Sequence, residues 1–183
     1  EVDYLMATPL SSKVPVRSAI MIAGGAYLVK PTRAQVLAGR RESYFNRTWE
    51  HFSSHQHAPD VDKPATPSAL ITPQIAYFAH NLFSAYRANG QPLYRDFFEV
   101  ALRKLLGNKL EVETNLPTTG RLTVMEQSKQ RRYVAHLLYS PTSVRGKFRD
   151  LNIELIEDVI PLRDTRVALR LPKKVKRVQL VPD

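Results

Sequence analysis

The 183-residue sequence contains no cysteine. A disulfide framework, thiolate metal sites and cysteine nucleophiles are therefore excluded. No apolar run approaches the roughly 20 residues needed to cross a bilayer, so the sequence predicts no membrane span. The most apolar early stretch, AIMIAGGAYLV at 19–29, lacks the cleavage signature of a signal peptide, and we expect it to form a buried strand.

Sequence signatures of common catalytic sites are also missing. There is no glycine-rich phosphate loop, no G-x-S-x-G nucleophile turn and no H-E-x-x-H zinc helix. Glu154, Glu157 and Asp158 lie together in a predicted strand, where we expect arginines of adjacent strands to balance them through cross-strand pairs. His136 alternates as a strand residue and is expected in a core or on a sheet face. The residues alone define no active site.

Positive charge is in excess, since 27 basic residues outweigh 17 acidic ones and the net charge is +10. The excess lies mainly after Gly120. A basic surplus attracts nucleic acid in some proteins, but this tail lacks the interleaved aromatic and glycine residues that single-strand binders use for base stacking. We therefore expect a solvated basic sheet face and no nucleic-acid partner.

The middle of the chain has the apolar period of helices. A helix is predicted from Pro92 to a stop at Gly107-Asn108, and a shorter one from about Asn81 to Ala88, ended at Asn89-Gly90. The longer helix is expected to present one apolar face, made of Tyr94, Phe97, Phe98, Ala101, Leu102 and Leu105.

Extended segments are predicted on both sides of the helices. Before them, residues 26–31 and 34–40 resemble two strands joined by a turn, a loop with Pro59, Pro64 and Pro67 follows, and residues 70–71 and 75–79 are strand-like. Six alternating segments follow the helices, at 110–115, 121–127, 132–140, 152–160, 165–172 and 175–182. The sequence thus predicts an α+β chain: the end of an α/β domain, a boundary near residue 115, then an antiparallel β-sandwich or small barrel.

One segment, YFNRTWEHFSSHQHAPD at 44–60, holds three of the five histidines and the single tryptophan. His51, His55 and His57, with Asp60 or Asp62, are a candidate zinc site, although their spacing matches no standard zinc signature. The favoured interpretation is a structural or interface loop stapled by aromatic rings, with no metal and no cofactor. These rings are Tyr44, Phe45, Trp49 and Phe52.

Two parts of the chain resemble a known family. They are residues 44–60 with 75–106, and RRYVAHLLYSP at 131–141 with the ending IELIEDVIPLRDTRVALRLPKKVKRVQLVPD. Together they resemble the C-terminal region of large bacterial glycoside hydrolases described as α-L-fucosidases or putative β-galactosidases. In this group a (β/α)₈ barrel precedes an amidotransferase-like domain, related to the β-galactosidase trimerisation domain, and a terminal β-rich domain.

The resemblance implies a non-catalytic region for domain docking and oligomerisation. Residues 1–115 would be the end portion of the amidotransferase-like, flavodoxin-like domain, and residues 116–183 the β-sandwich. The implied partners are the N-terminal catalytic barrel of a parent protein, further copies of the chain and, through the parent enzyme, a carbohydrate in a bacterial cytoplasm. The chain begins with Glu1 rather than Met, so we expect it to be a piece of a longer protein.

The loop of residues 44–57 then becomes a candidate border of a sugar pocket or of an interface. Its candidate residues are Tyr44, Asn46, Arg47, Trp49, His51, His55 and His57. Two alternatives stay open. One is a carbohydrate-binding module, although the predicted sandwich holds only Tyr133, Tyr139 and Phe148 as aromatics. The other is a small metal-dependent hydrolase that uses His51, His55 and His57.

Overall fold

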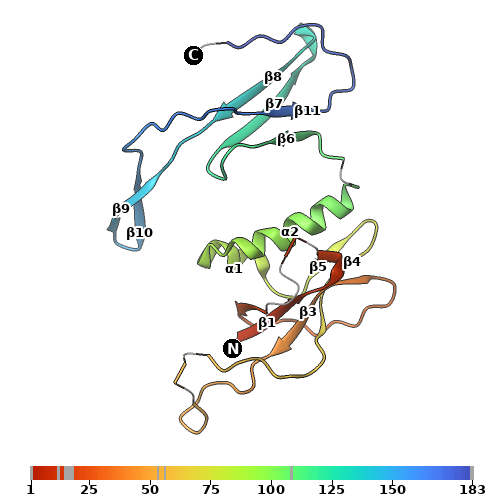
Figure 1. Cartoon of the computed structure of the whole chain (residues 1–183), viewed down its shortest axis with the longest axis vertical. Helices are drawn as coiled ribbons and strands as arrows, with labels where there is room; N and C mark the ends of the chain where they lie inside the picture. Colours follow the sequence, from red (N-terminus) through yellow and green to blue (C-terminus); the bar gives the residue numbers. More distant parts are fainter. Residues whose placement is uncertain are drawn as a thin grey trace. The chain divides into compact units, whose positions relative to one another are not determined.

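The computed structural model describes residues 2–11, 13–14, 19–52, 54–55, 57–107 and 109–181. The chain divides into two compact units, Glu1–Lys109 and Leu110–Asp183, which Figure 1 shows with their strands and helices. It is mostly antiparallel β with two helices, so the predicted α+β class is confirmed. The identities predicted for 1–115 and 116–183 remain predictions.

The first unit is built on a five-stranded sheet with strand order β2-β1-β3-β4-β5. The strands are β1 (Val2–Ala7), β2 (Ile20–Ala23), β3 (Gln35–Glu42), β4 (Thr66–Ile71) and β5 (Ala76–Phe78), and a short 3₁₀ turn, η1 (Pro9–Ser11), follows β1. Every pairing in this sheet is antiparallel. A flavodoxin-like sheet is parallel, so the amidotransferase-like assignment is not confirmed.

Both predicted helices are confirmed, as α1 (Leu82–Asn89) and α2 (Pro92–Leu105). Gly90 ends α1 with a left-handed φ of 63°, which glycine adopts without steric strain. The Gln91 side chain then accepts a hydrogen bond from the Leu93 N–H, and Pro92 occupies the first turn of α2. Among the described residues no helix is long and apolar enough to cross a membrane.

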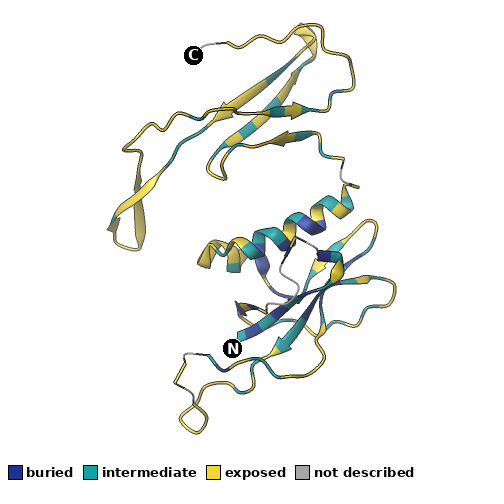
Figure 2. Ribbon diagram, in the orientation of Figure 1, coloured by how far each residue is buried: buried dark blue, intermediate teal, exposed yellow. Residues whose placement is uncertain are grey.

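The two helices pack on one face of the sheet and close the core of the first unit, the dark blue region of Figure 2. The buried face of α2 consists of Tyr94, Phe97, Val100 and Ala101. The Tyr94 hydroxyl donates to the Met21 carbonyl oxygen at 2.5 Å, which ties α2 to β2. Phe98 and Leu102, predicted on the same face, are instead 36% and 38% exposed.

The strands of the first unit differ from the prediction in two places. Pro67 is predicted in a loop, but it lies in β4 opposite Gly39, next to register shifts in β3. These shifts accommodate a proline inside a sheet. A Cβ atom on Gly39 would lie 2.7 Å from the Ala65 Cβ, so only glycine fits. The strand predicted at 26–31 is wrong, because residues 24–34 lie outside the strands.

The described residues of the second unit, 110–181, form three separate two-stranded antiparallel sheets. The pairs are β6 (Val112–Thr114) with β11 (Val167–Leu169), β7 (Arg121–Gln127) with β8 (Arg132–Leu138), and β9 (Ser143–Phe148) with β10 (Leu151–Leu155); a 3₁₀ turn, η2 (Ser128–Gln130), joins β7 to β8. None of the described residues from 110 to 181 is buried, as the yellow and teal ribbon of Figure 2 shows. A sandwich needs two sheets packed over a core, so this part of the fold prediction is not confirmed.

Strand positions in the second unit match the sequence only in part. The predicted strand at 152–160 stops at Leu155, and residues 175–181 lie outside the strands. The sequence pattern does not predict β9. Of the expected pairs between arginines and Glu154, Glu157 and Asp158, the described residues show one, between Glu157 and Arg145 of β9. Glu157 lies after the end of β10, so this ion pair does not join two strands.

Adjacent phenylalanines of α2 give a test of this packing. Phe97 is 1% exposed, so Phe97→Ala should cost about 3–5 kcal/mol through weaker packing and a cavity. Phe98 packs against the Phe83 ring at 4.9 Å between centroids, so Phe98→Ala should cost only about 1 kcal/mol. Urea unfolding of the full chain measures both. Equal losses of stability would contradict the orientation of α2.

Candidate functional site

The aromatic–histidine loop, defined as residues 44–57, begins at the end of β3 and stands on a closed base. Ser53 and Gln56 lie outside its described residues. Backbone contacts join the outgoing and returning chain: Tyr44 N–H donates to Pro59 O at 2.8 Å, Val61 N–H donates to Glu42 O at 3.0 Å, and Ser43 and Asp60 form an antiparallel bridge. The loop is therefore an extension of β3 rather than a free linker.

Two side chains from the sheet brace this base. The Tyr4 hydroxyl donates to the Ala58 carbonyl oxygen at 2.5 Å, and Arg41 Nη1 lies 3.0 Å from Asp60 Oδ2. Tyr4 and Arg41 are partners in the β1–β3 register. Leu5, next in β1, points into the core, so alternation places Tyr4 on the opposite face. The loop thus stands on the sheet face that the helices do not cover.

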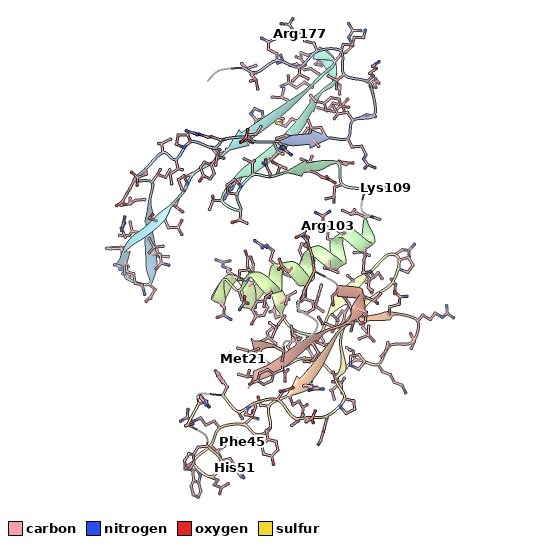
Figure 3. All side chains as sticks on the ribbon, viewed as in Figure 1. Met21, Phe45, His51, Arg103, Lys109 and Arg177 are labelled. Carbon is pink, nitrogen blue, oxygen red and sulfur yellow. The ribbon has the colours of Figure 1, made fainter. Side chains whose placement is uncertain are left out.

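The outer part of the loop is a tight turn with aromatic side chains. The Thr48 N–H donates to His51 O at 2.8 Å, and the His51 N–H donates to Thr48 Oγ1 at 3.1 Å. The Phe45 and His51 rings lie 6.0 Å apart between centroids, side by side in Figure 3. Trp49 is 87% exposed and Phe52 is 73% exposed. Exposed rings on a braced turn favour contact with a partner or a ligand.

An open hollow lies between the loop and the chain that returns to the sheet. Its lining residues are Tyr44, Phe45, His51, Val61, Asp62 and Lys63. This set joins two rings and an imidazole to a carboxylate and an ammonium group, a combination that suits a polyol with an apolar face. The sequence pattern singles out Tyr44 and His51, but it does not indicate that Asp62 lines a hollow, and it does not point to Lys63.

The other predicted site residues lie outside the lining of this hollow. Asn46, Arg47, Trp49 and His55 are exposed, and His57 is half-buried. Within the described ranges, no three His, Asp or Glu side chains come close enough together to hold a metal ion. The described structure therefore gives the zinc alternative no support.

A second polar cluster, which the sequence did not predict, lies inside the first unit. His80 Nε2 lies 2.8 Å from Asp3 Oδ2, and His80 Nδ1 lies 3.0 Å from Ser68 Oγ. A carboxylate only accepts hydrogen bonds, so Nε2 carries the proton and the Ser68 hydroxyl donates to Nδ1. Arg40 Nε lies 2.9 Å from the same Asp3 oxygen, as an ion pair without hydrogen-bond alignment.

This Ser–His–Asp cluster has the composition of a hydrolase triad but not its accessibility. Ser68, His80 and Asp3 are 2%, 5% and 4% exposed. The cavity beside Ser68 and His80 has a volume of about 10 Å³, enough for one water molecule at most, and its lining is almost wholly apolar. A nucleophile must reach its substrate, so we assign the cluster a structural role. No sequence spacing could have revealed it, because Asp3 and His80 are 77 positions apart.

Burial sets the protonation state of His80 in this cluster. Loss of hydration lowers the pKa of His80 below its usual 6.5, and this effect outweighs the hydrogen bond and charge of Asp3, which raise the pKa. The positive charge of Arg40 lowers the pKa further. His80 is therefore neutral in the folded chain near pH 7.

This shift makes stability depend on pH. The unfolded chain takes up a proton on His80 near pH 6.5, whereas the folded chain does so only at lower pH. The stability due to neutral His80 is complete above pH 6.5 and is lost as the pH falls through the folded-state pKa. Urea unfolding of the full chain between about pH 7.5 and about pH 5 should show this loss.

Two variants and one spectroscopic measurement serve as controls. His80→Gln should flatten the pH dependence, and His136→Gln, at an exposed strand position, should leave it unchanged. An NMR titration of the His80 ring in the unaltered chain does not depend on the variant folding. A ring pKa at or above 6.5 would contradict the assignment.

Comparisons with known proteins give one informative result. No family model matches the chain, and no curated protein matches it. A solved structure, α-L-fucosidase isoenzyme 2 from Paenibacillus thiaminolyticus, is similar over 93% of this chain, with a TM-score of 0.82 and 34% sequence identity. The chain spans 25% of the length of that protein. The predicted resemblance to the C-terminal region of a bacterial α-L-fucosidase is thereby confirmed.

Proposed function

We propose that this chain is a non-catalytic accessory region of a glycoside hydrolase of the α-L-fucosidase type, which docks on the catalytic part and contributes to assembly. The observation that carries the proposal is the similarity, 34% identical over 93% of the chain, to a quarter of a bacterial α-L-fucosidase. At this identity the likeness concerns sequence as well as fold. The remainder of such a protein would supply the nucleophile and the acid/base residue.

The sealed Ser68–His80–Asp3 cluster supports an accessory role. Its serine hydroxyl faces the core, and the adjoining cavity is too small for a sugar. Among the described residues that line the hollow beside the aromatic–histidine loop, Asp62 is the only one with a carboxylate, whereas glycosidases of both stereochemical classes use two. Neither place supplies the groups that hydrolysis of a glycosidic bond needs.

The open surfaces of the second unit support docking. Phe148 and Leu151 face each other across β9 and β10, yet they are 62% and 71% exposed. Leu138, Leu155 and Ile160 are 62%, 48% and 54% exposed. Two-stranded sheets are marginal by themselves and gain stability when an apolar face is covered. In this proposal the rest of the longer protein, or another copy of it, covers these side chains.

The aromatic–histidine loop would form a second contact. Tyr4 and Arg41 brace the base of the loop, so Trp49 and Phe52 lie on a turn whose base is fixed. Exposed Trp and Tyr side chains are frequent anchors of protein interfaces and also stack on sugar rings. The loop would therefore touch the catalytic domain or a neighbouring subunit, at or beside the sugar pocket.

The first test compares the chain with the protein that carries it in its source. Intact mass of the source protein should exceed 20.8 kDa, the mass of this chain. That protein should release 4-nitrophenol from 4-nitrophenyl α-L-fucopyranoside, and the chain alone should not exceed the uncatalysed rate. A panel that includes the β-D-galactopyranoside checks sugar specificity. Hydrolysis by the chain alone would refute the accessory role.

The second test concerns the loop. Trp49→Ala in the longer protein should weaken subunit assembly, or raise KM for the fucoside, by about tenfold or more, because buried tryptophans dominate interface energies. Tyr27→Ala is the matched control, since Tyr27 is another highly exposed ring, at 79%, outside the loop. Sedimentation velocity and steady-state kinetics measure the two effects. If Trp49→Ala leaves both unchanged, the loop makes neither contact.

A further inference from the structure

Seven basic side chains gather near the end of the second unit. We call them the basic strip: Arg163, Arg166, Arg170, Lys173, Lys174, Lys176 and Arg177. Between residues 163 and 177 the only acidic side chain is Asp164. The strip thus accounts for seven of the 27 basic residues of the chain within a span of fifteen positions.

The charges of the strip are exposed and uncompensated. All seven side chains belong to exposed residues. In the described part of the chain none of them forms an ion pair, whereas Arg145 of the same unit pairs with Glu157. Unpaired like charges at close spacing repel one another, so a bound polyanion would relieve a repulsion that the folded chain itself does not balance.

The first part of the strip is held on a fixed scaffold. The Asn115 side chain accepts a hydrogen bond from the Arg166 N–H at 2.6 Å and donates one to the Asp164 carbonyl oxygen at 2.9 Å. The Arg170 N–H donates to Glu111 O at 2.8 Å. Arg166 and Arg170 flank β11 at positions of equal parity, so they project from the same face of the strand.

We propose that the basic strip is a binding site for an anionic polysaccharide, one that carries sulfate or carboxylate groups. The choice of a sugar polymer rests on the proposed function as part of a glycosidase. Arginine binds planar and tetrahedral oxyanions through two parallel N–H groups, and lysine supplies point charge along the polymer. Single-stranded nucleic acid is disfavoured because residues 163–181 contain no aromatic side chain on which bases could stack.

The site would serve to hold the enzyme on a charged polymer while a separate pocket cleaves single residues from it. Neutral glycans would bind the strip weakly, because it has charged side chains but no aromatic ring on which a sugar could stack. The strip therefore selects a substrate class rather than a particular sugar. Its affinity should fall steeply with salt, as for other contacts made between basic side chains and a polyanion.

Binding of the full chain to dextran sulfate and to uncharged dextran tests the proposal, because the two polymers share a backbone and differ in sulfate. We expect binding to dextran sulfate only. Replacing Lys173, Lys174, Lys176 and Arg177 by Gln should weaken it by about tenfold or more and reduce the slope of log K against log salt by about one for each sulfate that is no longer bound. Isothermal titration at two or more salt concentrations measures both.

A matched control removes the same amount of charge elsewhere. Lys30, Arg87, Lys104 and Lys109, all exposed and also three lysines with one arginine, are replaced by Gln; this variant should bind within about twofold of the unaltered chain. Thermal melting of each variant verifies that it is folded. Equal weakening in both variants, or no binding of dextran sulfate, would refute a localised site.

An oligothymidylate separates a sugar site from a nucleic-acid site. We expect it to bind more weakly than dextran sulfate at the same salt and charge concentration; equal or tighter binding would overturn the choice of a polysaccharide. The result is independent of the proposed function, because it uses no hydrolysis. A chain that binds dextran sulfate while the source protein cleaves no fucoside would refute the fucosidase assignment and leave the strip in place.

Discussion

Asp3 places a carboxylate inside the first unit, where an unpaired charge would be strongly destabilising. The structure compensates it with His80 at 2.8 Å and Arg40 at 2.9 Å, and Ser68 completes the hydrogen bonding of the imidazole. These four side chains come from β1, β3, β4 and the junction between β5 and α1. The arrangement of the sheet and the start of the helical layer thus depend on satisfying one buried charge.

The alternation of β3 extends this constraint to the aromatic–histidine loop. Arg40 contacts Asp3 on the core face, and the next residue, Arg41, contacts Asp60 at the base of the loop on the other face. The same alternation in β1 places Asp3 in the cluster and Tyr4 against Ala58. Because neighbouring side chains of a strand point to opposite faces, the strand pair that closes the core also braces the loop.

How far the sequence predicts the fold depends on the distance over which each signal acts. The helices are marked by local features, such as Pro92 at the start of α2 and Gly90 after α1, and the sequence was enough to locate them. Pro67 suggested a loop, because nothing in the sequence shows the register shifts that admit it into β4. Phe98 and Leu102 fit the apolar period of α2, but the face that the helix buries is the one around Phe97, and the Phe98 ring lies against Phe83 of α1.

The sequence predicts the candidate site to a similar extent: it shows local features but not contacts between distant positions. The concentration of rings and imidazoles at 44–57 is visible in the sequence, and it locates the exposed loop. The side chains that brace the loop are Tyr4 and Arg41, and Lys63 lines the hollow beside it; none of these residues lies within that segment. The Asp3–His80 contact joins positions 77 residues apart, and only the folded sheet brings them together.

The two units differ in how much of their apolar surface they bury, and this difference bears on the proposed role of the second unit. The first unit buries a core between its sheet and its own helices, whereas none of the described residues of the second unit is buried. The second unit also exposes the apolar side chains on β9 and β10 and the basic strip after β11. Salt weakens contacts between exposed charges by screening, while apolar contacts are not screened, and salts such as sulfate strengthen them. The proposed docking through the apolar side chains and the proposed polyanion binding through the strip would therefore respond to salt in different directions. Such a unit would stay attached to its partner while it releases a charged polymer.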